Sequence, residues 1–255
     1  MTKKILITGA NGDVGKELVV FLKKYDYEVF SFVRKKINKK DVLGDICNCN
    51  FLVNATKDID IVIHLALLIK GNKKNLQKIN IKGTKNLIEA CKKNKVNKII
   101  YISSLDIKFN TNYGISKKIA EEIVKNSGLE YVILRPSLMY GENFKKGIPE
   151  LINLIKKSFI IPVPGNGKNL FCPLYVNDLN LIIYQIIDKN KFNKKTYFIC
   201  GNSEISMNNL IDLIDLYLNK NITKIHFPVV LMKKVLNLFG ININMIDNAC
   251  INKTE

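Results

Sequence analysis

The chain has 255 residues, enough for one domain or for one domain with a smaller lobe, and it can bury a large core without disulfides or metals. With 47% hydrophobic and 24% charged residues it has a globular composition, which excludes a disordered tail. No apolar run approaches the roughly 18–20 residues of a membrane span, and the N-terminus leads directly into a strand-like segment. We therefore expect a cytoplasmic protein with no signal peptide and no membrane span.

The net charge of +18 raises the question of a nucleic-acid partner. Of the 40 basic residues only Arg34 and Arg135 are arginines, and the lysines are spread along the whole chain. Nucleic-acid readers favour arginine for bidentate contacts, so this charge is typical of a solvated lysine surface. A nucleic-acid binder is the weakest of the alternatives, and we expect no such partner.

The six cysteines are scattered along the chain. Cys47 and Cys49 do not have zinc-ligand spacing, and His64 is far from His226 in the sequence. We therefore expect no metal site, and we interpret the cysteines as small apolar residues.

The first half of the chain alternates short apolar runs with amphipathic segments. The pattern predicts strands at 4–8, 28–33, 41–46, 59–65, 98–103 and 130–134, and helices at 14–24, 79–93 and 116–125. Strands that are apolar throughout and alternate with helices indicate a parallel sheet covered on both faces. The sequence therefore predicts a doubly wound α/β domain over residues 1–135, whose last strand is stopped by Arg135 and Pro136.

After Pro136 the prolines and glycines become frequent and the segments short. Helices are expected at 148–157, 176–187 and 207–218, with a last one near 229–239. We interpret residues 136–255 as a smaller lobe packed at the carboxyl ends of the strands, because ligands of open α/β sheets bind there.

A glycine-rich loop follows the first expected strand. Gly9 and Gly12 stand between this strand and the first expected helix, and Gly15 lies at the start of that helix. In dinucleotide-binding folds one such glycine permits a tight turn, one lets backbone amides approach a pyrophosphate, and one lets helix and strand pack closely. The helix N-terminus then faces the phosphates. The loop therefore predicts a dinucleotide coenzyme, with a merely tight turn as the alternative.

This loop and the segments after it resemble one enzyme superfamily. The pattern Thr-Gly-x-x-Gly-x-x-Gly at 8–15 is similar to that of the short-chain dehydrogenase/reductases, in the extended and atypical branches that include the NAD-dependent epimerase/dehydratase family. Further segments that resemble the family follow in order: Gly44–Ile46, Asp60–Ala66, Asn80–Thr84, Tyr101–Ser104, Tyr113–Lys117, Leu134–Pro136, Tyr140–Gly141 and Pro173–Leu179. The resemblance implies a Rossmann-like sheet with a smaller C-terminal substrate lobe.

The resemblance also implies which residues contact the coenzyme. They are Gly9, Asn11, Gly12, Asp13, Val14, Gly15, Arg34, Asp45, Ile46, Leu65, Ala66, Asn80, Tyr113 and Lys117. Arg34 follows the second strand, where an acidic residue would favour NAD and an arginine accommodates the 2′-phosphate of NADP. We therefore expect NADP(H) to be favoured, with NAD(H) as the alternative.

The resemblance implies a catalytic set of Ser104, Tyr113 and Lys117. Tyr113 and Lys117 are one helical turn apart and share a helix face. In the family the tyrosine is the acid/base, the lysine lowers the tyrosine pKa and holds the nicotinamide ribose, and the serine hydrogen-bonds the reacting oxygen. Ser103 is the competitor of Ser104, and His64 is expected to be structural or to line the coenzyme site.

Several departures from the family limit what the sequence says about the substrate. Ser104 is not followed by the common Val-Tyr-Gly, the gap to Tyr113 is short, and no arginine occurs after Arg135 to hold a diphosphate. Lys168 is a substitute cation, but only as a point charge. Asn143, Lys168 and Cys172 are the candidate substrate residues, with ordinary loop residues as the alternative.

We therefore expect an NAD(P)-dependent oxidoreductase or epimerase of the extended short-chain type, acting on a hydroxyl or keto carbon of an activated sugar. The first alternative is an NADPH-dependent reductase of another small carbonyl compound. The second is a catalytically silent NAD(P)-binding sensor or assembly subunit. A homodimer is common in the family.

Overall fold

The structure of the protein is a computed structural model that describes residues 2–36, 38 and 41–228; the helix predicted at 229–239 lies outside this range. The described residues form two compact units. The first contains the chain up to Ser137 together with Val176–Ile199, and the second contains Leu138–Tyr175 and the described residues from Cys200 onward.

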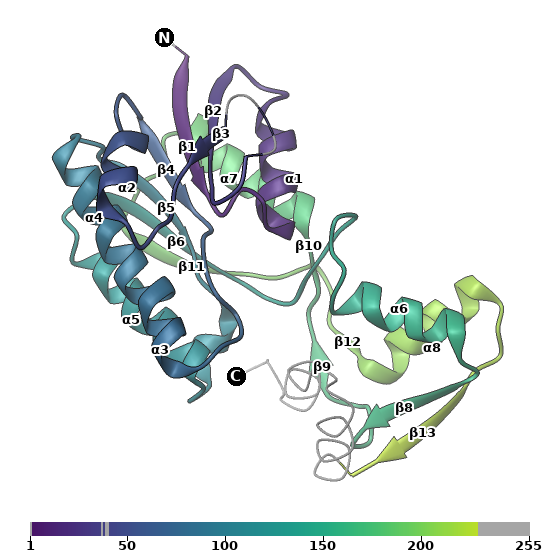
Figure 1. Cartoon of the computed structure of the whole chain (residues 1–255). Helices are drawn as coiled ribbons and strands as arrows, with labels where there is room; N and C mark the ends of the chain where they lie inside the picture. Colours follow the sequence, from purple (N-terminus) through teal and green to yellow (C-terminus); the bar gives the residue numbers. More distant parts are fainter. Residues whose placement is uncertain (1, 37, 39–40, 229–255) are drawn as a thin grey trace. The chain divides into compact units, whose positions relative to one another are not determined.

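The first unit is built around a seven-stranded parallel sheet (Figure 1). Its strands are β1 (Lys3–Thr8), β2 (Tyr27–Val33), β3 (Asp41–Leu43), β4 (Ile61–His64), β5 (Lys98–Ile102), β6 (Glu130–Pro136) and β11 (Lys195–Ile199). They lie in the order β11-β6-β5-β4-β1-β2-β3, with every neighbouring pair parallel. This order is that of a doubly wound sheet, so the predicted fold class is confirmed.

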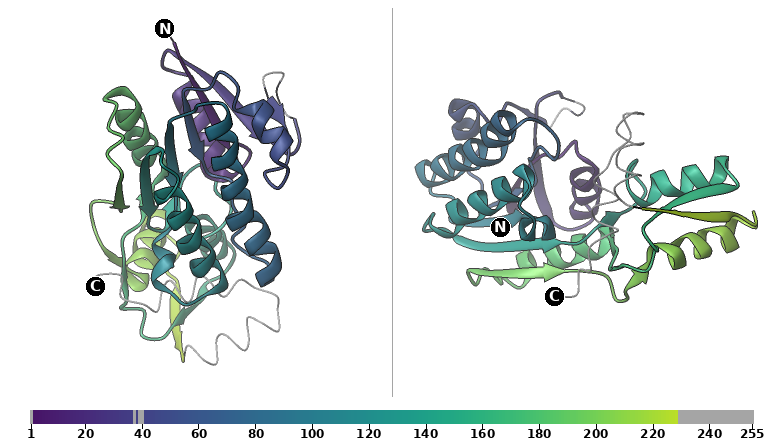
Figure 2. Two further views of the ribbon diagram at one scale, coloured as in Figure 1. Left: turned by 90° about the vertical axis from the view of Figure 1, so that its left-hand side faces the viewer. Right: turned by 90° about the horizontal axis from the view of Figure 1, so that it is seen from below.

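Helices cover both faces of this sheet. They are α1 (Asp13–Leu22), α2 (Cys49–Ala55), α3 (Lys73–Leu76), α4 (Gly83–Lys93), α5 (Asn112–Lys125) and α7 (Val176–Asp188). Figures 1 and 2 show α1 beside α7 on one face and α2, α4 and α5 on the other. Strand residues such as Leu6, Val62 and Ile99 are completely buried beneath α4 and α5, with Leu87 and Ala120 as their helical partners.

The division of the chain corrects the predicted boundary at residue 136. The prediction places Val176–Ile199 in the C-terminal lobe, whereas the structure places this segment in the first unit. The reason is that β11 adds a parallel strand to the edge of the sheet beside β6, and α7 packs on α1. The sequence pattern missed β11 because its side chains are mostly exposed and therefore lack a continuous apolar run.

The bounds of several elements also differ from the prediction. β6 is not stopped by Arg135 and Pro136, because both residues pair with β11 on its outer side. β3 ends at Leu43 instead of continuing to 46. The helix expected at 79–93 begins earlier, as α3, continues through a π-helical segment at Gln77–Lys82, and becomes α4.

The second unit packs two helices with short strands. The helices are α6 (Ile148–Lys157) and α8 (Met207–Leu218), and the strands are β7 (Met139–Tyr140), β8 (Ile160–Pro164), β9 (Leu170–Phe171), β10 (Leu174–Tyr175), β12 (Ile205–Ser206) and β13 (Thr223–Phe227). Leu151 and Ile155 of α6, Ile161 of β8, and Met207 and Ile211 of α8 form its core, and Figure 2 shows the two helices against the β8–β13 pair. Within the described residues, no helix has the length and apolar character that crossing a bilayer requires.

Candidate active site

The loops that carry the predicted site leave the carboxyl ends of β1, β4 and β5. β4 and β2 lie on opposite sides of β1, so the chain winds in opposite directions from this strand. In open α/β sheets such a switch point is where ligands bind, at the carboxyl ends of the strands. The fold therefore places the glycine loop after β1 and the Ser103–Ser104 pair after β5 at the same end of the sheet, where the strands have their carboxyl ends.

The glycine loop packs closely against the segment after β4. Gly9 has a φ of +73°, and a Cβ there would lie 2.6 Å from the backbone nitrogen of Ala66. A Cβ on Gly15 would lie 2.3 Å from the carbonyl oxygen of Gly9. The backbone nitrogen of Leu65 donates to the carbonyl of Thr8 at 3.1 Å. Gly9 and Gly15 are thus required by the packing of the protein itself.

Gly12 differs from the other two glycines and bears on whether the loop fits a dinucleotide. It is exposed, and a Cβ there would approach the protein no closer than 3.3 Å. It precedes α1 at the N-cap, where no side chain caps the helix, while Asp13 and Val14 form its first turn. Uncapped amide groups at a helix N-terminus bind phosphate, and a side chain on Gly12 would cover them. The residues present therefore fit a pyrophosphate.

The end of β2 lies beside the glycine loop. The amide of Asn11 donates to the carbonyl oxygen of Lys35 at 3.0 Å, which ties the loop to the segment containing Arg34. Arg34 is exposed. Asp45 and Ile46 follow β3: Asp45 accepts from the backbone nitrogen of Cys47 at 2.8 Å, and Ile46 is buried. The predicted coenzyme contacts of Arg34, Asp45 and Ile46 stay predictions.

His64 ends β4 and is almost completely buried. Its Nδ1 lies 2.8 Å from the Thr8 hydroxyl and its Nε2 lies 3.0 Å from the Thr84 hydroxyl. Because Thr84 donates its proton to the carbonyl oxygen of Asn80, it accepts from Nε2, and Nδ1 accepts from Thr8. Burial and, secondarily, Lys117 lower the His64 pKa to about 3. His64 is therefore neutral and joins two threonines beneath the site.

Asn80 connects three parts of the site. Its Oδ1 accepts from the backbone nitrogen of Leu68 at 2.7 Å, and its Nδ2 donates to the carbonyl of Leu68 and to the hydroxyl of Ser116, both at 2.9 Å. The side chain therefore holds the segment after β4 and helix α5 together. These two partners use both hydrogens of the Asn80 amide nitrogen. A direct contact of Asn80 with a coenzyme stays a prediction.

Ser104 and Tyr113 come together at the carboxyl end of β5. Ser104 caps a short 3₁₀ helix by accepting from the backbone nitrogen of Asp106 at 3.1 Å, and its side chain lies close enough to the Tyr113 phenol to lower the pKa of that phenol. Tyr113 lies in the first turn of α5, which Thr111 caps. The competing Ser103 hydroxyl is buried and has no hydrogen-bond partner among the described residues. Ser104 therefore lies beside Tyr113, and its role as the catalytic serine stays a prediction.

Burial decides the direction in which the Tyr113 pKa is shifted. It raises this pKa above its ordinary value of 10.0, and the Asp106 carboxylate raises it further. Ser104 acts in the opposite direction. The phenol is therefore protonated at neutral pH. The physical reason is that Tyr113 sits in a poorly solvated site beside an acid. The lowering by Lys117 that the family resemblance implies stays a prediction.

Lys117 is buried on the same face of α5, with 1% of its surface exposed. Its ammonium donates to the carbonyl oxygen of Ile102 at 2.7 Å and lies 4.1 Å from the centre of the Tyr101 ring. Burial lowers the Lys117 pKa to about 7, against the opposing effect of Glu121. The side chain is therefore only partly charged near neutral pH.

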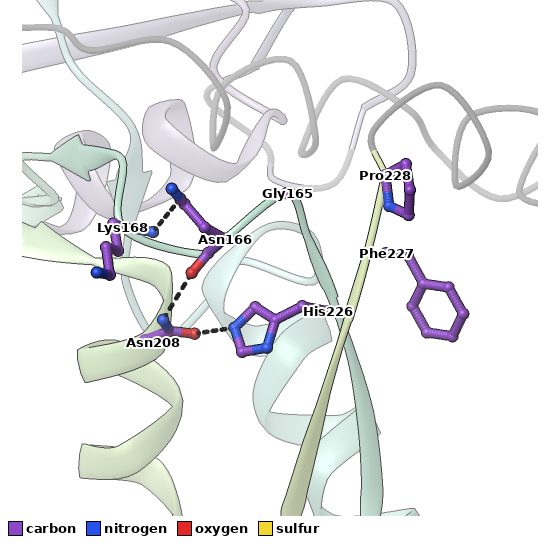
Figure 3. A pocket seen from close by; sticks show the side chains of 7 residues that line it. All are labelled: Gly165, Asn166, Lys168, Asn208, His226, Phe227 and Pro228. Carbon is purple, nitrogen blue, oxygen red and sulfur yellow. Dashed lines mark hydrogen bonds between the residues drawn. The ribbon is translucent and has the colours of Figure 1, made fainter.

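The second unit contains a cavity of about 560 Å³ (Figure 3). It is lined by Gly165, Asn166, Lys168, Asn208, His226, Phe227 and Pro228. The imidazole Nε2 of His226 lies 3.1 Å from Oδ1 of Asn208, whose Nδ2 donates to the carbonyl of Asn166 at 2.9 Å. Asn166 in turn accepts from the backbone nitrogen of Lys168 at 3.0 Å. These contacts fix a polar rim with one cation.

Of the three candidate substrate residues, one lines this cavity. Lys168 lines the cavity, but Asn143 and Cys172 are not among its lining residues. The Cys172 thiol donates to the carbonyls of Gly201 at 3.0 Å and Ser203 at 3.2 Å. Sequence reasoning missed Asn208 and His226, which reach the cavity from α8 and β13. The Gly-Asn-Gly-Lys turn at 165–168 was the available signal, but nothing local indicated its partners.

Comparisons with known proteins agree with this geometry. The sequence model of the NAD dependent epimerase/dehydratase family matches residues 5–200. The UDP-glucose 4-epimerase of Vibrio cholerae is 29% identical over 94% of this chain and 83% of that protein.

Two solved structures show the same fold. The UDP-glucuronic acid 4-epimerase from Bacillus cereus in complex with NAD is 23% identical and has a TM-score of 0.79 over 88% of this chain and 87% of that chain. The dTDP-4-dehydrorhamnose reductase from Bacillus anthracis in complex with NADP is 24% identical, with a TM-score of 0.79 over 97% of this chain and 98% of that one.

Proposed function

The chain belongs to the NAD dependent epimerase/dehydratase family of enzymes, and we propose that it is an NAD(P)-dependent oxidoreductase or epimerase acting on a hydroxyl or keto carbon of an activated sugar. The observation that carries the proposal is the position of Ser104 beside the Tyr113 phenol at the carboxyl end of β5. The match to a nucleotide-sugar epimerase over 94% of the chain supports the substrate class.

The side chains of this pair divide the proton chemistry between them. A bound nicotinamide supplies or accepts the hydride. The Tyr113 phenol transfers the proton at the reacting oxygen, and the Ser104 hydroxyl holds that oxygen by a hydrogen bond. Lys117 supplies a positive charge on the same face of α5, which stabilises negative charge on the phenol when it is deprotonated.

The test is Tyr113→Phe, which removes the proton and leaves the ring. We expect the fold and the coenzyme affinity to stay nearly unchanged and turnover to fall by at least about 10²-fold, the usual size of an acid/base contribution. UDP-glucose and dTDP-glucose with each coenzyme serve as first substrates. Tyr217→Phe is the matched control, because Tyr217 is 90% exposed on α8. Full activity of the Tyr113→Phe enzyme would exclude the mechanism.

One observation favours a second candidate, the reduction of a carbonyl compound. The raised pKa of Tyr113 keeps the phenol protonated at neutral pH, and this is the form that donates a proton to a carbonyl oxygen. A keto-sugar and a small ketone offered with NADPH would separate this candidate from epimerisation. A chain that binds coenzyme but converts neither would instead be the silent sensor or assembly subunit.

We infer a preference for NADP(H). The support is the position of the exposed Arg34 beside the glycine loop, which Asn11 fixes through Lys35. A guanidinium binds the 2′-phosphate bidentately, so Arg34→Ala should weaken NADP(H) binding by one to two orders of magnitude with little effect on NAD(H). Lys57→Ala removes an exposed cation elsewhere and is the control. Equal or tighter NAD(H) binding by the wild type would refute the preference.

We further infer that Lys168 in the cavity of the second unit contacts the anionic part of the substrate. Its support is the polar rim of Asn166, Asn208 and His226 that surrounds a single cation in this cavity. Asn143 and Cys172 stay weaker candidates. A homodimer and a cytoplasmic location also stay proposals, which light scattering and cell fractionation test directly.

A further inference from the structure

A line of polar side chains continues along the buried face of α5 beyond the proposed catalytic residues. Tyr113, Lys117 and Glu121 follow one another at intervals of four residues, so their side chains occupy one face of the helix. Lys117 and Glu121 are each 1% exposed. A carboxylate buried this deeply is costly unless it is paired, so the position of Glu121 requires an explanation.

Arg135 of β6 supplies the partner of Glu121. Its Nε donates to one carboxylate oxygen at 2.9 Å and its Nη2 donates to the other at 2.6 Å. This bidentate geometry fixes the position of the carboxylate beside the guanidinium. The guanidinium also lies 5.1 Å from the ring of Phe198 on β11. Lys125 approaches Glu121 only to 4.0 Å and binds the exposed Glu122 at 2.8 Å.

The titratable groups beside Lys117 come from three elements of the first unit. His64 acts on it from β4, the Tyr101 ring faces it from β5, and Glu121 acts on it from α5. His64 is neutral, and burial raises the pKa of Tyr101 well above its ordinary value, so that phenol is neutral as well. Glu121 is therefore the negative charge that opposes the effect of burial on Lys117.

We propose that Glu121, held by Arg135, is a positioning residue that keeps Lys117 in its ammonium form. The catalytic part of this proposal rests on the function proposed above, in which the ammonium acts. Without the carboxylate, Lys117 loses its proton at a lower pH, and the coenzyme site then lacks its charge at neutral pH. The Glu121–Arg135 pair thereby acts on the reaction without touching the substrate.

The experiment measures the titration of Lys117 by NMR in protein labelled at the lysine Cε. Lys117 is expected to titrate with a midpoint of about 7, apart from surface lysines near 10.4, and Lys117→Met assigns its resonance. Glu121→Gln should lower this midpoint by at least about one pH unit, the usual effect of a nearby charge. Glu122→Gln, which changes the exposed neighbour, should leave it unchanged.

A double variant separates charge from packing. Glu121→Gln leaves Arg135 unpaired and risks misfolding, whereas Glu121→Gln with Arg135→Met removes both charges. The proposal expects a lowered midpoint in the double variant as well, because the carboxylate is still missing. A wild-type midpoint in the folded double variant would overturn the proposal.

Coenzyme binding measured on the same samples distinguishes the two proposals. If the wild type binds NAD(P)H, we expect affinity in the double variant to fall at a lower pH than in the wild type, by the same interval as the NMR midpoint. If the midpoint moves but the wild type binds no nicotinamide coenzyme, the proposed function fails, whereas the effect of Glu121 on the protonation of Lys117 stands. If coenzyme binds but the midpoint does not move, only the effect of Glu121 on Lys117 is refuted.

Discussion

Gly12 and Gly15 lie in the same loop, but the structure predicts different consequences when each is replaced by alanine. A Cβ on Gly15 would lie 2.3 Å from the carbonyl oxygen of Gly9, about 1.1 Å short of the 3.4 Å at which ordinary contact begins. A Cβ on Gly12 would lie 3.3 Å from the same oxygen, about 0.1 Å short. The first substitution forces the backbone apart, and the second does not.

The expected stability changes follow from these distances. Overpacking at Gly15 costs about 3 kcal/mol, of which the better helix propensity of alanine recovers about 1 kcal/mol, leaving a loss of about 2 kcal/mol. For a chain of this size that corresponds to a Tm lower by about 4–8 °C. At Gly12 the φ of −74° suits alanine, so the gain from a stiffer unfolded chain and the loss of a good N-cap residue cancel to within about 1 kcal/mol.

For coenzyme binding we expect Gly12 to be the sensitive position, although its replacement hardly changes the stability. The added methyl group on Gly12 covers the uncapped amides of α1, so Gly12→Ala should weaken NAD(H) and NADP(H) binding at least about tenfold at unchanged Tm. Differential scanning fluorimetry gives the Tm, and quenching of coenzyme fluorescence gives the Kd. Wild-type affinity in a Gly12→Ala protein of wild-type stability would refute the assignment of this loop to a pyrophosphate.

Three further predictions concern charge. Asp106→Asn removes a charge that raises the pKa of Tyr113, so the limb of the rate profile that needs ionised Tyr113 should move to lower pH, as initial rates across pH would show. His64 has a pKa of about 3 in the folded protein and about 6.5 in the unfolded chain, so it contributes stability above pH 6.5 that is lost as the pH falls toward 3. The free energy of unfolding should therefore decrease with falling pH in this range. His64→Gln should reduce this pH dependence by up to about 1.4 kcal/mol per pH unit, as measured by urea unfolding. Lys168→Ala should raise the KM for a diphosphate sugar with little change in kcat, and an unchanged KM would remove Lys168 from the substrate site.

Much of the first unit could be predicted from the sequence because its buried strands are apolar throughout. The apolar runs at 4–8 and 98–103 are typical of buried parallel strands. The glycine loop indicated the strand from which the chain winds in opposite directions. β11 could not be found in this way: Phe198 is 57% exposed at the sheet edge and Lys195 begins the strand. An edge strand buries only part of its surface and therefore leaves a weaker pattern.

The candidate site was predictable in its members but not in its electrostatics. The spacing of Tyr113 and Lys117 indicated one helix face, which α5 shows. The sequence could not reveal that Lys117 is turned toward the carbonyl of Ile102 or that Asp106 lies beside the Tyr113 phenol, because both depend on tertiary packing. The pair of Glu121 and Arg135 could not be predicted for the same reason, because the two residues lie on different elements and meet only in the folded protein.

The return of Val176–Ile199 to the first unit has a consequence for how the protein is made. During synthesis β6 emerges from the ribosome before Leu138–Tyr175, and its outer edge stays unpaired until β11 follows. Open strand edges invite pairing with other chains, and proline, such as Pro136 at the end of β6, limits such pairing. A fragment cut at Ser137 would keep this edge open and should aggregate during expression. A fragment in which Ser137 is joined to Val176–Ile199 by a short linker would instead carry the complete sheet, and it is the rational starting point for producing the first unit alone.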